Sequence, residues 1–158
     1  MFRKMRRFKQ QISEAECIEL LRTQKRGVLS LIGDNGYPYG IPIDHLYCEE
    51  DGVVYFHGAK EGHKIDAVKR CNKACYCVYD EGYRNPGEWA LNIKSVIVFG
   101  RIELVADAAK TKEICTRLVK KFTDDEQYLE KELKSALSRV QCLALIPEHM
   151  TGKLVKES

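Results

Sequence analysis

The sequence predicts a mainly β protein, an antiparallel barrel of six strands with peripheral helices on its outside. Six apolar runs have the length and composition of strands. Asp34-Asn35-Gly36 separates the first two, and Asn-Gly is typical of a hairpin turn because both residues tolerate a positive φ. No regular alternation of strand and helix indicates a parallel sheet, and closure into a barrel removes exposed strand edges.

The first third of the chain is expected to hold one helix and three strands. Ser13 and Glu16 have the spacing of a capping box, which predicts a helix that ends near Gln24. The three strands are expected at 27–32, 37–47 and 53–57. Because proline removes a ladder donor, Pro38 and Pro42 place the second strand at a sheet edge or a sharp bend.

The rest of the chain is expected to supply three helices and three strands. The helices are expected at 64–70, from Asp107 to about Phe122, and over about 125–138. The strands are expected at 74–80, 94–105 and 140–146. Residues 81–93 form an irregular loop, and we expect Trp89 in this loop to anchor it to the barrel.

Composition indicates an ordinary globular protein. The 158 residues fit one domain, 1–158, in which residues 1–12 form a basic N-terminal arm. No apolar stretch is long enough to span a bilayer and no secretory signal is recognised, so a cytoplasmic location with reduced thiols is expected. Cys71, Cys75 and Cys77 match no metal-binding spacing, and we expect no metal site. Cys75 and Cys77 are two residues apart on a predicted strand and therefore share one face of it. We expect them to be neighbouring small buried side chains.

The basic arm admits two interpretations. Five of the first ten residues are Lys or Arg, and clustered cations are typical of segments that contact a nucleic-acid backbone. The remaining charges are interspersed, without a basic stripe or a nucleic-acid motif, although the net charge is +3. A solvated tail is therefore favoured over a nucleic-acid partner.

The segment His57-Gly-Ala-Lys-Glu-Gly-His-Lys64 also admits two interpretations, a solvated turn or a phosphate cradle. Gly58 and Gly62 allow close approach of the backbone, His63 and Lys64 add positive charge, and a helix N-terminus follows. Glu61 argues against a cradle, because a carboxylate inside it would repel an anion.

Four segments together resemble the flavin-binding split-barrel superfamily of pyridoxamine phosphate oxidases, and within it the nitroimidazole-resistance branch. The segments are GIPIDHLY (40–47), VYFHGAKEGHKID (54–66), KSVIVFGRIELV (94–105) and HMTGKLV (149–155). Each is weak alone, but four in the family's order are specific. The resemblance implies a six-stranded antiparallel split β-barrel of FMN-binding type, and a homodimer with the flavin at the subunit interface.

The resemblance also implies the site residues. Pro42, Ile43, Asp44 and His45 fall on the strand beside the flavin ring system. Gly58, Ala59, Gly62, His63 and Lys64 fall on the phosphate-binding loop. His57 falls near flavin and substrate and is the candidate catalytic residue, with a hydrogen-bonded strand-end histidine as the alternative. Ser95 falls where family dimers reach the cofactor across the interface.

The implied function is that of an FMN-binding flavoprotein, with FAD not excluded. The resemblance implies that the protein is an oxidoreductase that passes electrons to a small aromatic substrate, of which a nitroimidazole is one example. The alternative is a non-catalytic flavin-binding sensor or carrier. A third reading, a nucleic-acid-binding module without flavin, depends on the basic arm alone.

Overall fold

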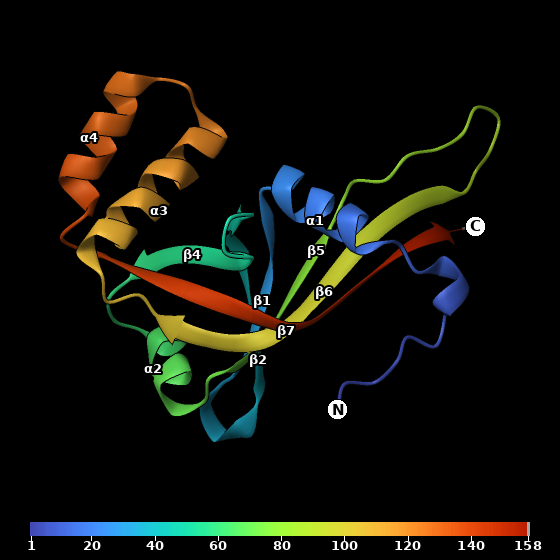
Figure 1. Ribbon diagram of the computed structural model, residues 1–158, viewed down its shortest axis with the longest axis horizontal. Coiled ribbons are helices and arrows are strands. Elements are labelled where there is room, and N and C mark those ends of the chain that lie inside the picture. The colour runs from blue at the N-terminus through green and yellow to red at the C-terminus, as the bar shows by residue number, and fades with distance from the viewer. Residues whose placement is uncertain (158) are drawn as a thin grey trace.

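The computed structural model describes residues 1–157, which form a curled antiparallel sheet with four α-helices around it (Figure 1). The helices are α1 (Glu14–Thr23), α2 (His63–Arg70), α3 (Ala108–Phe122) and α4 (Glu126–Ala136), with short 3₁₀ turns η1 (Phe8–Gln10) and η2 (Asp34–Gly36). The strands are β1 (Arg26–Ile32), β2 (Pro38–Asp44), β3 (Leu46–Cys48), β4 (Val53–Ala59), β5 (Lys73–Tyr79), β6 (Leu91–Leu104) and β7 (Val140–Glu157).

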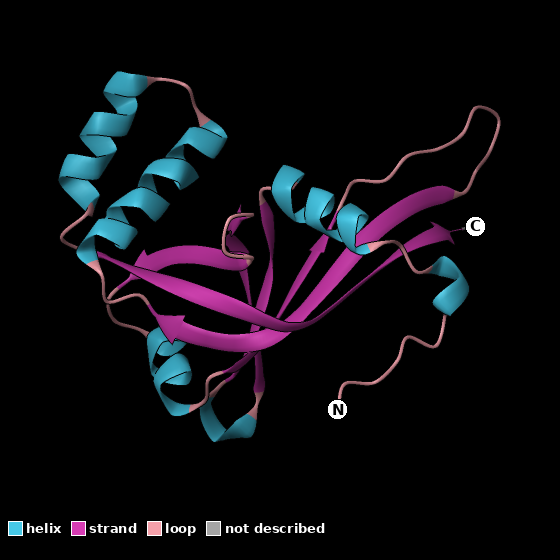
Figure 2. Ribbon diagram, viewed as in Figure 1, coloured by secondary structure: helices cyan, strands magenta, loops and turns pink. Residues whose placement is uncertain are grey.

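The sheet has seven strands in the order β2-β1-β5-β6-β7-β4-β3, so the expectation of six strands is wrong. Figure 2 shows the strands curling around a common centre with the helices outside them. The predicted single strand over 37–47 divides at His45. There the backbone N–H donates to the Lys25 carbonyl at 3.1 Å, one residue beyond the last pair of the β1–β2 ladder, Arg26 with Asp44, while the imidazole is completely buried. The mainly β class, the antiparallel pairing and the peripheral helices are as expected.

The division at His45 explains how the sheet curls into a half-barrel. β2 and β3 lie at opposite edges of the sheet, yet only one residue of chain joins them. The two edges must therefore approach each other at His45, which leaves a split barrel rather than a flat sheet. The expectation that the proline-containing strand lies at an edge is confirmed. In the turn before it, Asn35 and Gly36 have the positive φ values of 57° and 75° that this Asn-Gly pair was expected to supply.

Local sequence signals explain three helix starts. Ser13 and Glu16 form the predicted capping box of α1, with bonds of 3.0 and 3.2 Å between side chain and backbone in each direction. Asp107 and Asp125 accept the first free amides of α3 and α4. These caps satisfy amides that have no partner within the helix, so the helices begin close to the predicted residues.

Apolar side chains form two clusters on opposite faces of the strands. The larger fills the half-barrel and includes Phe56 and Tyr76 from the strands, Leu21 from α1 and Ile65 from α2. The smaller lies between α3 and the outer face of β4 and β7 and includes Tyr55, Ile114, Leu118 and Cys142. β7 is therefore buried on both faces near its start, which holds the α3–α4 hairpin against the barrel.

β6 and β7 continue beyond the barrel as a projecting two-stranded ribbon (Figure 1). The final strand was expected to end at residue 146, but β7 continues to Glu157. The pairing of β6 with β7 shifts in register between Phe99 and Gly100 and then continues along the ribbon. Trp89, in the loop before the ribbon, is 92% exposed, so the expectation that it anchors this loop to the barrel is wrong. The bridge between Tyr83 and Asn92 holds the loop instead.

Candidate functional site

The turn from β4 into α2 leaves backbone donors without a capping side chain. Gly62 is the N-cap residue with a φ of 131°, and it offers no side chain to the helix. The first intrahelical bond is donated by the amide of Asp66 to the Gly62 carbonyl at 3.0 Å. The preceding amides, from His63 to Ile65, point out of the helix end and are available to an anion.

Lys64 lies beside these amides with its ammonium folded over Gly58. A Cβ atom at Gly58 would collide with Lys64 Nζ, so the absence of a side chain there makes room for the cation. Lys64 is partly buried, and burial lowers its pKa below the ordinary value. Among residues 1–157 it has neither an ion pair nor a side-chain hydrogen bond with an acidic group. A partly desolvated cation without a carboxylate partner favours the arrival of an anion.

The side chain of His63 turns away from Lys64 toward the β1–β2 turn. Its ring stacks on Tyr39 with the centroids 3.9 Å apart, and its Nε2 accepts from the Asp34 amide at 3.4 Å. Arg70 donates to the side-chain carboxylate of Asp34 at 2.7 Å, which is the main reason that the Asp34 pKa is lowered. At the turn between β4 and α2, His63 therefore presents its backbone amide, while its ring faces the β1–β2 turn.

His57 and Asp44 lie together in a recess of about 200 Å³ beneath the α3–α4 hairpin. The recess is lined by Asp44, His57, Leu118, Val119, Phe122, Tyr128 and Glu132. His57 is exposed overall, yet partial desolvation by the residues around it lowers its pKa, an effect that Asp44 opposes and Lys64 strengthens. Asp44 is itself paired with Arg26 at 2.6 Å. The recess thus combines an apolar helical wall with a neutral imidazole and two carboxylates.

His45 lies beneath this strand as part of the fold rather than at a surface. Its Nε2–H donates to the Leu21 carbonyl at 2.7 Å, which leaves Nδ1 to accept from the Tyr76 hydroxyl at 2.7 Å. Burial lowers the pKa of His45 to about 4. Lys121 donates to the His45 carbonyl at 2.8 Å. The imidazole, the backbone N–H and the carbonyl of His45 therefore all have partners within the fold.

Ser95 lies far from the other predicted residues. It pairs with Lys153 on β7, whereas His57 pairs with Cys142, eleven residues earlier on the same strand. Eleven residues of strand extend about 36 Å. A recess of about 170 Å³ surrounds Ser95 and is lined also by Arg3, His149, Thr151 and Lys153. One chain therefore brings Asp44 to His57 and Gly58 to Lys64, but it does not bring Ser95 to them.

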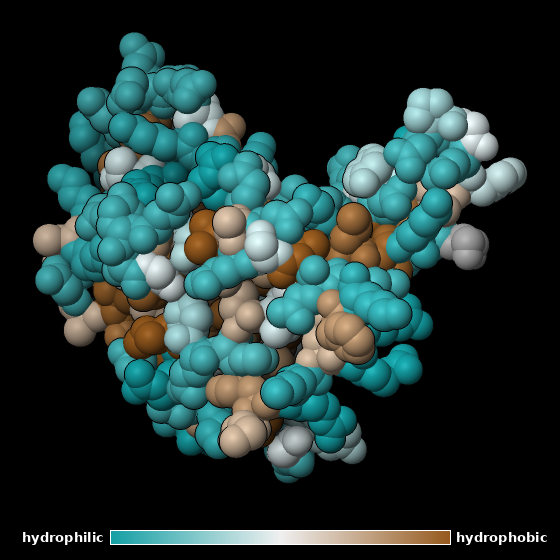
Figure 3. Space-filling model, turned by 45° about the vertical axis from the view of Figure 1, so that its right-hand side comes forward, coloured by the Kyte–Doolittle hydropathy of each residue, from teal (hydrophilic) through white to brown (hydrophobic). Residues whose placement is uncertain are grey.

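The middle of the outer face of β1, β5 and β6 carries uncharged, partly exposed side chains, whereas Lys73 and Arg101 lie opposite each other at one end of the same face. Two rows of opposite residues cross it, Val28–Cys77–Ile97 and Ser30–Cys75–Phe99. Cys75 and Cys77 share this face as predicted, but they are partly exposed rather than buried. Phe2 of the N-terminal arm stacks on His149 at one side of the face, with the centroids 4.9 Å apart. Apolar surface is also visible at the base of the projecting ribbon (Figure 3).

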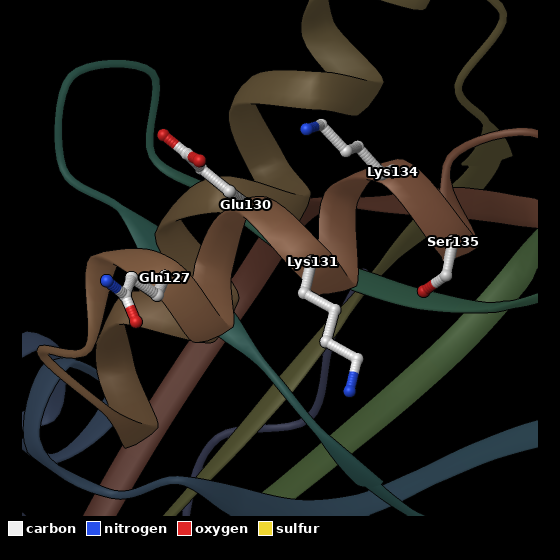
Figure 4. Close-up of a pocket in the computed structure, with 5 residues that line it drawn as sticks. All are labelled: Gln127, Glu130, Lys131, Lys134 and Ser135. Atoms are coloured by element: carbon white, nitrogen blue, oxygen red, sulfur yellow. The ribbon is translucent and has the colours of Figure 1, made fainter.

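A wider depression of about 500 Å³ lies on α4, and its lining argues against a ligand site. Figure 4 shows the lining side chains diverging from one helix face, with no common point toward which they converge. They are Gln127, Glu130, Lys131, Lys134 and Ser135. Within the part of the chain that the structure describes, no group of three or more His, Cys, Asp or Glu residues is placed to hold a metal ion.

The helical wall of the recess was not found by sequence reasoning. Leu118, Phe122 and Tyr128 are about 60 to 70 residues from His57 in the chain, and their pattern indicates only two amphipathic helices. The same holds for Lys121 and Tyr76, whose hydrogen bonds connect distant segments. No local motif marks such residues, because their role depends on how α3 packs on β4 and β7.

Comparison with known proteins identifies the family and the fold. The family model described as pyridoxamine 5'-phosphate oxidase matches residues 13–154. No curated protein sequence matches the chain. Across the described residues 1–157, no helix is long and apolar enough to cross a membrane.

Several solved structures have the same fold. A candidate 5-nitroimidazole antibiotic resistance protein from Bacteroides thetaiotaomicron has a TM-score of 0.78 at 21% identity, covering 93% of this chain and 87% of that chain. An FAD-binding protein from Mycobacterium smegmatis has a TM-score of 0.66 at 19% identity, covering 94% and 99%. A candidate pyridoxamine 5'-phosphate oxidase from Listeria innocua has a TM-score of 0.62 at 20% identity, covering 87% and 94%.

Proposed function

The chain belongs to the pyridoxamine 5'-phosphate oxidase family, and from this membership we propose that it is a flavin-binding protein with FMN as its cofactor. The observation that carries the proposal is Lys64, a partly buried cation without an acidic partner among the described residues, folded over Gly58 beside the uncapped start of α2. A phosphate monoester is close to a dianion at neutral pH and requires such a combination of cation and amides.

Backbone amides and one lysine side chain bind the phosphate in this proposal. The amides of His63, Lys64 and Ile65 donate hydrogen bonds, and the Lys64 ammonium adds the opposite charge. Gly58 and Ala59 keep the approach free of bulky side chains. Glu61 is exposed, so the carboxylate that argued against a cradle can face solvent.

The proposed activity is electron transfer to a small aromatic acceptor bound in the recess of Asp44 and His57. A bound flavin would supply the two-electron chemistry, and the protein would supply orientation and exclusion of water. Leu118, Val119 and Phe122 form an apolar wall for an aromatic ring. The neutral His57 donates an N–H to the acceptor as negative charge builds on it. The likeness to a candidate 5-nitroimidazole resistance protein makes nitroimidazoles the first acceptors to test.

The proposal includes a homodimer. Ser95 lies about 36 Å along β7 from the partner of His57, so it can complete a cofactor site only in a second copy. The uncharged middle of this outer face, with Val28, Cys77, Ile97 and Phe99, is where this second copy would pack. Light scattering of Ile97→Glu measures this directly, with a monomer expected for the variant and a dimer for the native chain.

The test of flavin binding is the visible spectrum of the purified protein, with chromatography of the cofactor released by heat. FMN near one per subunit is expected, whereas FAD would revise the cofactor only. Lys64→Met should release most of the FMN, while Lys69→Met, an exposed lysine on the same helix, should retain it. A native protein that neither carries flavin nor quenches added FMN fluorescence would overturn the proposal.

The alternative is a flavin-binding sensor or carrier without turnover. It is favoured by relatives described only as FAD-binding proteins, such as that from Mycobacterium smegmatis. Anaerobic mixing of the flavin-loaded protein with NADH or NADPH separates the two functions. Bleaching of the flavin absorbance, followed by reoxidation with a nitroimidazole, indicates a reductase, and an unchanged spectrum indicates the sensor or carrier.

A further inference from the structure

Two buried thiols meet where α3 packs on β7. Cys115 Sγ and Cys142 Sγ are 3.8 Å apart, with exposures of 7% and 0%. Cys115 lies on the buried side of α3 between Ile114 and Leu118, and Cys142 lies on the face of β7 that α3 covers. The contact thus joins a helix and a strand through two cysteines that are 27 residues apart in the chain.

The two thiols are chemically unequal. The two thiols share a hydrogen bond in which either sulfur can donate, and this bond is the main reason that the pKa of Cys142 is raised and that of Cys115 is lowered. The thiolate is the reactive form of cysteine. Cys115, with the lower pKa and the greater exposure, is therefore the attacking group, and Cys142 is the thiol positioned to resolve the product.

The pair also lies next to the recess that contains His57. Cys142 is the direct cross-strand partner of His57, and side chains opposite each other on neighbouring strands lie about 5 Å apart at Cβ. One turn beyond Cys115 on α3, Leu118 and Val119 form the wall of that recess. Any bond between the two sulfurs therefore fixes this wall to the strand beside His57.

We propose that Cys115 and Cys142 are a reversible disulfide site, oxidised by low-molecular-weight disulfides, which ties α3 to β7 at the edge of the recess. A disulfide has a sulfur–sulfur distance of about 2.05 Å, so the two atoms approach by somewhat less than 2 Å. The proposal concerns these two thiols and does not depend on flavin binding.

The oxidation proceeds in two balanced steps. The Cys115 thiolate attacks one sulfur of the small disulfide, forms a mixed disulfide and releases one thiolate. Cys142 then gives up its proton and attacks Cys115 Sγ, which forms the intramolecular bond and releases the second thiolate. The two cysteine sulfurs lose two electrons in total, and the added disulfide gains them and becomes two thiols.

The experiment treats the purified full chain with glutathione disulfide and maps its thiols by mass spectrometry of a non-reduced tryptic digest. The expected product is a linked pair of peptides, 113–117 with 140–153, which dithiothreitol separates. The same sample should unfold at a higher urea concentration than the reduced protein, because the bond closes a loop in the unfolded chain.

Variants distinguish this site from the other thiols. Cys115→Ala should abolish both the linked peptides and the rise in urea midpoint, and Cys71→Ser, at a partly exposed position elsewhere, should change neither. A native chain that remains folded under oxidation with peptides 113–117 and 140–153 unlinked overturns the proposal, even where Cys75 and Cys77 become oxidised. This result stands without a variant and does not depend on whether Cys115→Ala folds.

Discussion

Two partly buried lysines, Lys64 and Lys121, show how differently one protein uses similar charges. Lys121 donates to the His45 carbonyl at 2.8 Å, above an imidazole that is itself bonded to Leu21 and Tyr76. Lys64 lies over Gly58 beside free amides and has no acidic partner among residues 1–157. Burial is the leading cause that lowers the pKa of both.

The difference teaches which polar groups belong to the fold and which remain for a ligand. The groups around Lys121 satisfy one another, so their hydrogen bonds contribute to stability. The groups around Lys64 do not, and the desolvation of the ammonium is compensated only when an anion arrives. Substitutions in the first region should therefore change stability, and those in the second should change ligand affinity.

The largest effect is expected from His45→Leu. The substitution leaves the buried Leu21 carbonyl without its donor and the Tyr76 hydroxyl without one acceptor, at a cost of about 2–3 kcal/mol in the free energy of unfolding. Urea denaturation at pH 7 measures it. A loss below about 0.5 kcal/mol would show that this network is not what holds the strand.

The pH dependence of the free energy of unfolding tests the same His45 network. His45 has a pKa of about 4 in the folded protein and an ordinary value of 6.5. Between these values the unfolded chain binds more protons, so stability is complete above pH 6.5 and decreases as the pH falls toward 4. His45→Leu should lack this part of the decrease, and its deficit relative to the native chain should become smaller at pH 4.

Lys64→Met is expected to raise the dissociation constant for FMN by about 10- to 100-fold, the cost of about 1.5–3 kcal/mol for one charge-assisted bond. Its free energy of unfolding without flavin should change by less than about 0.5 kcal/mol, because no partner loses a bond. Fluorescence titration measures the affinity, with Lys69→Met as the matched control. Equal affinities for the two variants would contradict the assignment of Lys64 to the ligand.

Lys121→Met tests the other lysine through pH. The Lys121 pKa is about 8 in the folded protein against an ordinary 10.5, so the unfolded chain binds more protons between these values. This residue should therefore make the native protein more stable as the pH rises from 8 to 10.5, by about 1–2 kcal/mol after allowance for its partial exposure. The variant should lack that rise, and an identical pH profile for both proteins would be inconsistent with a desolvated Lys121.

His63→Phe should have the smallest effect. Phenylalanine preserves stacking on Tyr39 and loses only the exposed contacts with Asp34, at a cost below about 1 kcal/mol. Because the ring faces the β1–β2 turn, the affinity for FMN should change by less than about threefold. A tenfold loss would show that the ring turns toward the ligand and would weaken the contrast between His63 and Lys64.

Much of the fold could be predicted because its signals are local. The capping box at Ser13, the caps at Asp107 and Asp125 and the Asn35-Gly36 turn each act within a few residues. The division of 37–47 at His45 could not be predicted, since it depends on a carbonyl of Lys25 and a hydroxyl of Tyr76. Nor could the exposure of Trp89, because nothing near it in sequence shows that the ribbon projects beyond the barrel.

The sequence by itself determined the antiparallel class, most helix starts and the composition of the turn from His57 to Lys64, because these follow from contiguous residues. Only the tertiary structure decided what those residues do. It turned the His63 ring to Tyr39, left Lys64 without a carboxylate partner among the described residues and brought α3 over His57. It also separated Ser95 from the rest of the predicted site. Whether a charge is satisfied depends on neighbours from distant segments, and only packing determines those neighbours.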